Sequence, residues 1–175
     1  MINEFPIVSQ TVSTSSFFFF TLSRNGRVIH LTFAQEKHRR ACLFLQKSGA
    51  IVSSPPTELS RADLLTLLQR TPCLTEFSAT TFIEQATSFQ RRVWRLICEI
   101  GFGSTRTYGE LAEMLGNKGL ARAVGRACNA NPIALFIPCH RVVGSAEIGG
   151  FSGGMEVKQK LLELEKVKPC RASPD

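Results

Sequence analysis

The sequence contains no C-x-x-C pair and no apolar run of the length needed to cross a membrane. Its six cysteines stand at irregular spacings, at positions 42, 73, 98, 128, 139 and 170. This spacing excludes a zinc ribbon and does not indicate the disulfide framework of a small secreted domain. Because several cysteines fall inside apolar, periodic segments, we expect reduced thiols in an intracellular protein.

The features of a secretory signal are missing as well. No basic residue precedes the phenylalanine run at residues 17–20, and no cleavage-like site follows it. We therefore expect a soluble protein without a membrane partner, located in the cytoplasm or, in a eukaryote, in the nucleus.

The composition is that of a globular protein with an excess of positive charge. Hydrophobic residues make up 43% and charged residues 20% of a 175-residue chain, which is long enough for a substantial core. The net charge of +7 favours a polyanionic partner. Residues 88–175 hold 13 Lys and Arg against 8 Asp and Glu, so the more basic half is the better candidate for such binding.

The first half predicts a small α/β scaffold domain at residues 1–86. Two β-forming runs, at residues 17–22 and 28–33, flank an Asn-Gly pair, which is typical of a hairpin because both residues tolerate positive φ. His30 and His38 are candidate metal ligands, but without paired cysteines we expect no metal site. The other elements expected here are helices at residues 35–47 and 59–69 and a strand at residues 77–82.

Residues 87–175 predict a second, mostly helical domain, which makes the chain an α+β protein. Ser88 can cap a helix whose apolar positions recur at helical spacing. Three arginines lie on the other side of this helix, and a solvated face is their simpler explanation, with DNA contact as the alternative. The apolar positions are Phe89, Val93, Leu96, Ile97 and Ile100, and the arginines are Arg91, Arg92 and Arg95.

A helix-turn-helix is predicted next. Thr107 and Glu110 form a capping-box pattern at the start of a helix over residues 108–115. A glycine turn follows, and then a helix over residues 120–130 that is rich in Ala and Gly and carries Arg122 and Arg126 four positions apart. Small residues suit close helix packing, but with the basic charge we favour contact with a sugar-phosphate backbone.

The most informative stretch ends in a cysteine. An apolar run at residues 133–137 is bounded by prolines and predicts a short buried strand or extended segment. It delivers Cys139, which His140 and Arg141 follow directly, so positive charge would favour the nucleophilic thiolate. The alternative is a cysteine that serves as a small buried hydrophobe, and neighbouring residues on an extended chain point to opposite sides.

Residues 142–148 predict a loop. A glycine-dense loop at residues 149–154 then leads into a helix predicted at residues 155–166, which carries Glu165 near its end. The loop lacks the lysine of a P-loop. We interpret it as one wall of a flat pocket, since glycines offer backbone N–H groups with little bulk.

These motifs together resemble those of the O6-alkylguanine-DNA alkyltransferases, also called methylated-DNA–protein-cysteine methyltransferases. The similarity runs from about residue 88 to residue 165, and the first half matches only in general plan. The matching motifs are Asn131-Pro132, Pro138-Cys139-His140-Arg141-Val142, Phe151-Ser152-Gly153-Gly154 and Ala121-Arg122-Ala123-Val124-Gly125.

The resemblance implies direct-reversal DNA repair. A base carrying an O6-alkyl group on guanine, or less readily an O4-alkyl group on thymine, would be flipped from the duplex, and its alkyl group would pass irreversibly to Cys139. His140 would activate the thiol through a water, with Glu165 orienting the imidazole. Asn131 would hold the turn before the cysteine, and Tyr108 would donate towards the leaving base.

The resemblance also implies a DNA surface and a base pocket. The helix with Arg122, Ala123 and Arg126 would lie in the minor groove, with Arg122 replacing the flipped nucleotide and Tyr108 nearby. The Val142 carbonyl, Phe151 and the Ser152 N–H would line the pocket. No cofactor and no metal is implied, and the protein would act once, as a monomer, with cooperative binding on DNA left open.

Some features depart from the family, and three other readings stay open. Phe151 stands where tyrosine is frequent, and Gly150 replaces a larger polar residue. The other readings are a lesion-binding protein without transfer, a helix-turn-helix regulator with a structural cysteine, and a cysteine hydrolase. The first would lack a reactive cysteine, the second would bind one DNA sequence, and the third would turn over.

Overall fold

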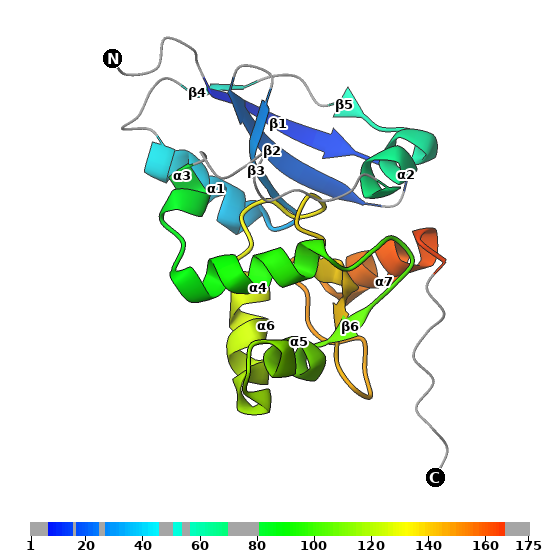
Figure 1. Ribbon diagram of the computed structural model, residues 1–175. Coiled ribbons are helices and arrows are strands. Elements are labelled where there is room, and N and C mark those ends of the chain that lie inside the picture. Colours follow the sequence, from blue (N-terminus) through cyan, green and yellow to red (C-terminus); the bar gives the residue numbers. More distant parts are fainter. Residues whose placement is uncertain are drawn as a thin grey trace.

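The computed structural model shows a strand-rich N-terminal part that lies against a mostly helical C-terminal part (Figure 1). This arrangement confirms the α+β fold class. One hydrophobic cluster runs through both parts, with Phe19 and Leu31 from the first and Val93 and Ile133 from the second. The division between residues 86 and 87 therefore stays a prediction. The structure describes residues 7–15, 17–24, 27–45, 51–53, 57–69 and 81–166.

The N-terminal sheet is built on a central hairpin. Strands β2 (Phe18–Arg24) and β3 (Arg27–Thr32) pair antiparallel, which confirms the predicted hairpin, while its Asn-Gly turn lies outside the described residues. Strand β1 (Ile7–Ser13) pairs antiparallel with β2 on the other side. Two short strands, β4 (Ile51–Ser53) and β5 (Thr57–Glu58), run parallel to β1.

The helices of this part cover the sheet. Helix α1 (Gln35–Leu45) buries Ala41 and Leu45 against Ile7 and Leu22, and residues 46 and 47 of the predicted helix lie outside the described residues. Helix α2 (Arg61–Gln69) starts two residues later than predicted. The reason is the Ser60 side chain, which caps α2 by accepting from the Asp63 N–H at 3.2 Å.

One strand prediction is wrong where it can be compared with the structure. Thr81 and Phe82 belong to a short helix, α3 (Thr81–Glu84), whereas residues 77–80 lie outside the described residues. The side chain of Phe82 packs on His30 and Phe44, with ring centroids 5.1 and 5.9 Å apart, so burial against α1 and β3 decides the local conformation.

The C-terminal part begins with α4 (Ser88–Cys98), and its cap is Thr87, not Ser88. Thr87 and Gln90 form a capping box, in which the Thr87 N–H donates to Gln90 Oε1 at 2.8 Å and the Gln90 N–H donates to Thr87 Oγ1 at 3.2 Å. The buried Trp94 ties α4 to the last helix of the helix-turn-helix, because its Nε1–H donates to the Ala127 carbonyl at 2.9 Å.

The predicted helix-turn-helix is confirmed. Helix α5 (Tyr108–Met114) carries the Thr107–Glu110 capping box, and helix α6 (Ala121–Asn129) follows a turn that includes the short η3 (Lys118–Leu120). The last helix, α7 (Met155–Leu164), ends two residues before the predicted end at residue 166, so Glu165 is its C-cap and does not lie within it.

The segment that leads to the cysteine is not a strand. Residues 131–134 meet the edge of β3, where the Leu31 N–H donates to the Pro132 carbonyl at 2.9 Å and the Ala134 N–H to the Leu31 carbonyl at 3.0 Å. The chain then turns back, with Leu135 at φ 71° and the Ile137 N–H donating to the Ile133 carbonyl at 2.9 Å. In Figure 1 this yellow segment reaches up from α6 to the sheet. The apolar run is buried as predicted, but as a turn.

A two-stranded parallel sheet corrects the loop expected after residue 141. Strand β7 (Val142–Val143) pairs with β6 (Arg106–Thr107), which directly precedes α5. Both valines are buried, so the backbone there needs partners. The pairing connects the cysteine segment to the start of the helix-turn-helix. Within the described ranges, no helix combines the length and apolar character of a membrane span.

The burial of His30 predicts that the protein loses stability as the pH falls. Burial, together with His38 and Lys37, lowers the pKa of His30 from 6.5 to about 4. Between pH 6.5 and pH 4 the unfolded chain therefore binds a proton at His30 that the folded chain does not. We expect the free energy of unfolding to fall by about 3 kcal/mol more in wild type than in His30→Phe over this range, measured by urea unfolding. The same pH slope for both proteins would contradict this account.

Candidate active site

Cys139 lies at the start of the short helix η4 (Cys139–Arg141), and Pro138 separates it from the turn of residues 133–137. Only 5% of the residue is exposed. Asn131 connects the turn to the sulfur: its Nδ2 donates to the Ile137 carbonyl at 2.7 Å and to Cys139 Sγ at 3.1 Å, while its Oδ1 accepts from the Ile133 N–H at 3.0 Å. The amide nitrogen of Asn131 thus donates two hydrogen bonds and its oxygen accepts one, so this side chain holds both the turn and the thiol in place.

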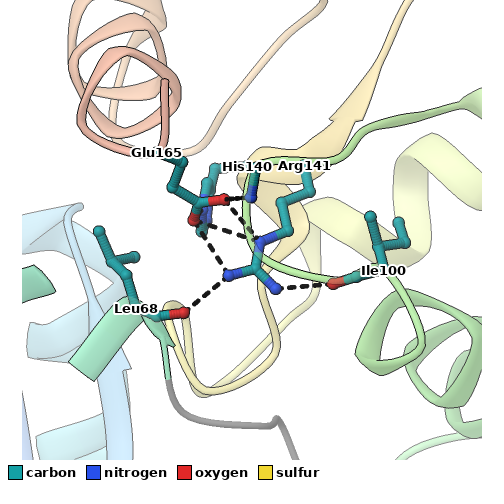
Figure 2. Close-up of polar contacts among 6 residues, drawn as sticks. Leu68, Ile100, His140, Arg141 and Glu165 are labelled. Carbon is teal, nitrogen blue, oxygen red and sulfur yellow. Dashed lines mark hydrogen bonds and ion pairs between the residues drawn. The ribbon is translucent and has the colours of Figure 1, made fainter. Parts of the chain in front are cut away.

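A buried carboxylate, Glu165, contacts the two residues that follow Cys139 in the sequence (Figure 2). Glu165 accepts a hydrogen bond from His140 Nε2 at 2.7 Å, and Arg141 Nε donates to it at 3.0 Å. The Gly103 N–H also donates to it at 3.0 Å. Burial alone would raise the pKa of the Glu165 carboxyl, but the hydrogen bonds from these three groups outweigh burial and lower it. Glu165 is therefore ionised at neutral pH.

Arg141 faces this carboxylate and the protein interior. Its remaining guanidinium donors reach the Ile100 carbonyl at 2.6 Å and the Leu68 carbonyl, in α2, at 2.8 Å (Figure 2). The sequence suggested that positive charge on Arg141 would favour the thiolate of Cys139. The structure corrects this, because the charge is compensated by Glu165.

His140 is neutral and oriented. Burial lowers its pKa, although the Glu165 carboxylate works in the opposite direction. Since Nε2 donates to a carboxylate, Nε2 carries the proton and Nδ1 keeps its lone pair. Nδ1 is buried and has no hydrogen-bond partner among the described residues. His140 thus has an unprotonated ring nitrogen and does not carry the positive charge suggested by the sequence.

The thiol itself is protonated at rest. Burial raises the pKa of Cys139, and the hydrogen bond from Asn131 and attraction to Lys158 and Lys37 lower it only in part. A buried thiol of this kind reacts only when a base removes its proton.

A cavity of about 410 Å³ opens beside the thiol. Its walls come from α5, α6 and the glycine-dense loop, which confirms that this loop forms a pocket wall. The volume and the aromatic residues in the walls suit a flat, nucleobase-sized ligand. The lining residues are Tyr108, Gly125, Cys128, Asn129, Cys139, Gly150, Phe151 and Ser152.

Tyr108 packs tightly against the loop. Its hydroxyl donates to the Gly150 carbonyl at 3.2 Å. A Cβ at Gly149, where φ is 73°, would come within 2.9 Å of the Tyr108 ring, so both the backbone conformation and the contact require glycine.

The structure does not bring Val142 to the cavity wall, where the resemblance placed its carbonyl. That carbonyl instead accepts from Lys158 Nζ at 2.6 Å. Lys158 was missed by the sequence reasoning; it is fully buried, and burial lowers its pKa to about 8. Its Nζ also contacts the Gly150 carbonyl at 3.3 Å. The sequence did carry one sign that Lys158 is buried. It lies three residues before Leu161 and four before Leu162, so all three share the apolar face of α7.

Cys128, in α6, was also missed. It places a second thiol in the cavity wall, and burial raises its pKa beyond the ordinary range. The only signal was its place on the buried face of a helix whose other face is basic.

Three of the predicted DNA-contact residues lie on α6, and the fourth, Tyr108, is the first residue of α5. Arg122 and Arg126 are exposed, and Ala123 is partly buried. Gly125 faces the Tyr108 ring, where a Cβ would lie 3.8 Å away, so the small residues of α6 serve helix packing as well as a low surface profile. His30 and His38 lie in the N-terminal part, and the described residues include no group of three or more His, Cys, Asp or Glu that could hold a metal ion.

Comparison with known proteins gives the C-terminal part a family context. Residues 88–167 match the family model described as "6-O-methylguanine DNA methyltransferase, DNA binding domain". The chain is 54% identical over 82 residues to a probable methylated-DNA–protein-cysteine methyltransferase of Acanthamoeba polyphaga mimivirus, covering 47% of this chain and 55% of that one. It is 50% identical over 94 residues to the methylated-DNA–protein-cysteine methyltransferase of Mycobacterium tuberculosis, covering 53% and 56%. The chain thus spans about half the length of the curated relatives it matches.

Solved structures extend the similarity to nearly the whole chain. The O6-methylguanine-DNA methyltransferase of Pyrococcus kodakaraensis superposes with a TM-score of 0.64 at 27% identity, covering 92% of this chain and 99% of that one. The Mycobacterium tuberculosis OGT, solved in complex with DNA, superposes with a TM-score of 0.61 at 31% identity, covering 91% and 92%.

The hydrogen bond from Asn131 to the sulfur predicts how Cys139 reacts with iodoacetamide. Asn131→Ala removes a donor to the thiolate, so the pKa of Cys139 should rise and its alkylation at pH 8 should slow by about tenfold. Mass spectrometry of the Cys139 peptide measures the rate, with Cys42 as the internal reference. Asn117→Ala, which removes an amide from the α5–α6 turn, is the matched control. An unchanged rate at Cys139 in a folded Asn131→Ala protein would show that this bond does not act on the sulfur.

Proposed function

Because the chain belongs to the O6-methylguanine-DNA methyltransferase family, we propose that it repairs alkylated DNA by moving the O6-alkyl group of a guanine to Cys139. A thiol in the wall of a nucleobase-sized cavity, backed by a buried imidazole–carboxylate pair, is the observation that supports this most. O4-alkylthymine would be a lesser substrate. The partner is double-stranded DNA, bound by one copy of the chain.

The proposed reaction uses Cys139, His140, Glu165 and Asn131. His140 Nδ1 takes the proton of the Cys139 thiol through a bridging water, while Glu165 holds the imidazole by its Nε2–H. The thiolate attacks the alkyl carbon, the new S–C bond forms as the C–O6 bond breaks, and the electron pair stays on the guanine, which then takes up a proton. Asn131 holds the sulfur in line during this step.

Tyr108 supports the departing base. Its hydroxyl, now bonded to the Gly150 carbonyl, would turn towards the guanine and stabilise the negative charge that develops there. Phe151 and Ser152 also line the cavity and would hold the ring. The product is a thioether, which water does not hydrolyse, so each molecule acts once. The proposed transfer uses no cofactor and no metal.

DNA binding would use the exposed face of α6. Its low profile lets the helix approach a minor groove, which carries little sequence information and so suits a protein that must find damage in any sequence. Arg122 would enter the base stack in place of the flipped nucleotide, and Ala123 and Arg126 would contact the backbone. An alkylated pair is weakened, which lowers the cost of extrusion.

The proposed division of labour follows the two parts of the fold. Residues 1–86 form a scaffold domain and residues 87–175 the DNA-binding and transfer domain. The protein would act in the compartment that holds the DNA, which is the cytoplasm in a prokaryote or the nucleus in a eukaryote.

Intact-protein mass spectrometry after incubation with an O6-methylguanine duplex tests this function. We expect wild type to gain the mass of one methyl group, located on Cys139, in a stoichiometric reaction without turnover. Cys139→Ala should gain nothing, whereas Cys128→Ala, which removes the other thiol of the cavity, should still be methylated.

Three other outcomes would overturn the proposal. Binding to the lesion with no change of mass would indicate lesion recognition alone. Binding that depends on the surrounding sequence, again with no change of mass, would indicate a regulator. Catalytic turnover would indicate a hydrolase.

A further inference from the structure

Lys37 is a residue of the N-terminal part that reaches the active site. It lies on α1, on a different part of the fold from Cys139. Its Nζ nevertheless donates to the backbone carbonyl of Asn129 and, at 3.1 Å, to Asn129 Oδ1. Asn129 is the last residue of α6 and lines the same cavity as Cys139. One lysine therefore connects α1 to the wall of the base pocket.

The place of this contact on α6 is favourable for a cation. The last carbonyls of a helix lack intrahelical partners and carry the negative end of the helix dipole. The Lys37 ammonium satisfies one of these carbonyls. Two residues further on, Asn131 donates to Cys139 Sγ, so the backbone held by Lys37 leads directly to the group that holds the sulfur.

The two basic residues that follow Cys139 in the sequence do not supply a free positive charge to the thiol, so a cation from elsewhere in the fold can act on it. Arg141 is compensated by Glu165, and His140 is neutral. Of the other groups that face Cys139, Tyr108 and Cys128 stay protonated, because burial raises the pKa of each. Among the described residues, the other charged groups that act on the thiol are Lys158 from α7 and Lys37 from α1.

We propose that Lys37 is a positioning residue for alkyl transfer, which fixes the end of α6 beside the cavity and stabilises the Cys139 thiolate by its charge. The N-terminal part would then contribute to the chemistry as well as to the fold. This inference rests on the function proposed above.

The effect of the charge is reciprocal. Burial lowers the pKa of the Lys37 ammonium, and the Cys139 thiolate partly offsets this. Burial raises the pKa of the Cys139 thiol, and attraction to the Lys37 ammonium is among the interactions that lower it. Removing the charge should therefore raise the pKa of the thiol and leave less thiolate at neutral pH.

Helix α1 also offers a matched control. Arg40 lies three residues from Lys37 and is exposed, and its guanidinium pairs with Glu36 at 3.1 Å. Arg40→Gln removes the same amount of charge from the same helix without touching the contact with Asn129.

The experiment compares Lys37→Gln, Lys37→Arg and Arg40→Gln with wild type. Lys37→Gln keeps a hydrogen-bond donor but loses the charge, whereas Lys37→Arg keeps the charge. Single-turnover methyl transfer from an O6-methylguanine duplex is measured between about pH 6 and pH 9. We expect Lys37→Gln to be about tenfold slower at pH 7, with the defect shrinking as pH rises because the thiol then ionises without help. Lys37→Arg should recover most of the rate, and Arg40→Gln should match wild type.

Two results would overturn the role of Lys37. Lys37→Gln could match wild type at every pH, or it could be slower by the same factor at every pH, which a merely structural contact would produce. If wild type itself takes up no methyl group, the proposed function fails. The effect of Lys37 on the thiol is then tested by the pH profile of Cys139 alkylation by iodoacetamide. That profile must move to higher pH in Lys37→Gln and stay in place in Arg40→Gln.

Discussion

The buried carboxylate of Glu165 is the group on which the site depends. It closes α7 and accepts hydrogen bonds from His140, from Arg141 and from the N–H of Gly103. Through Arg141 it also reaches the carbonyls of Leu68 and Ile100, so one ion pair joins elements from both parts of the chain. Removing one partner of such a pair typically costs about 3–5 kcal/mol, because a buried charge is left uncompensated.

This arrangement decides the chemistry as well as the packing. Glu165 compensates the charge of Arg141, and by holding the imidazole proton on Nε2 it leaves the lone pair of Nδ1 free of a proton. The groups that favour the thiolate of Cys139 are then the hydrogen bond from Asn131 and the charges of Lys158, on α7, and Lys37, on α1. A protonated thiol at rest fits the proposed single-turnover transfer, since a permanently ionised sulfur would be consumed by unrelated electrophiles.

The sequence predicted the local features well and the long-range contacts poorly. The Thr107–Glu110 capping box, the helix-turn-helix and the hairpin rest on short-range hydrogen bonding, which a few residues encode. The turn at residues 133–137 could not be predicted, because Leu135 takes positive φ only where Asn131 and the edge of β3 hold the chain. Of the site, Cys139 and its neighbours were visible as a motif. Lys37 and Lys158 were not, since their partners are backbone carbonyls far away in the sequence.

The protonation state of His140 tests the central claim most directly. With ¹⁵N-labelled histidine, the two ring nitrogens of His140 can be distinguished by NMR and assigned with a His140→Gln variant. The account predicts a proton on Nε2 and an unprotonated Nδ1 at pH 7, since burial keeps the pKa of His140 below its ordinary value. An imidazolium at pH 7, or a proton on Nδ1, would mean that Glu165 does not prepare His140 to act as the base.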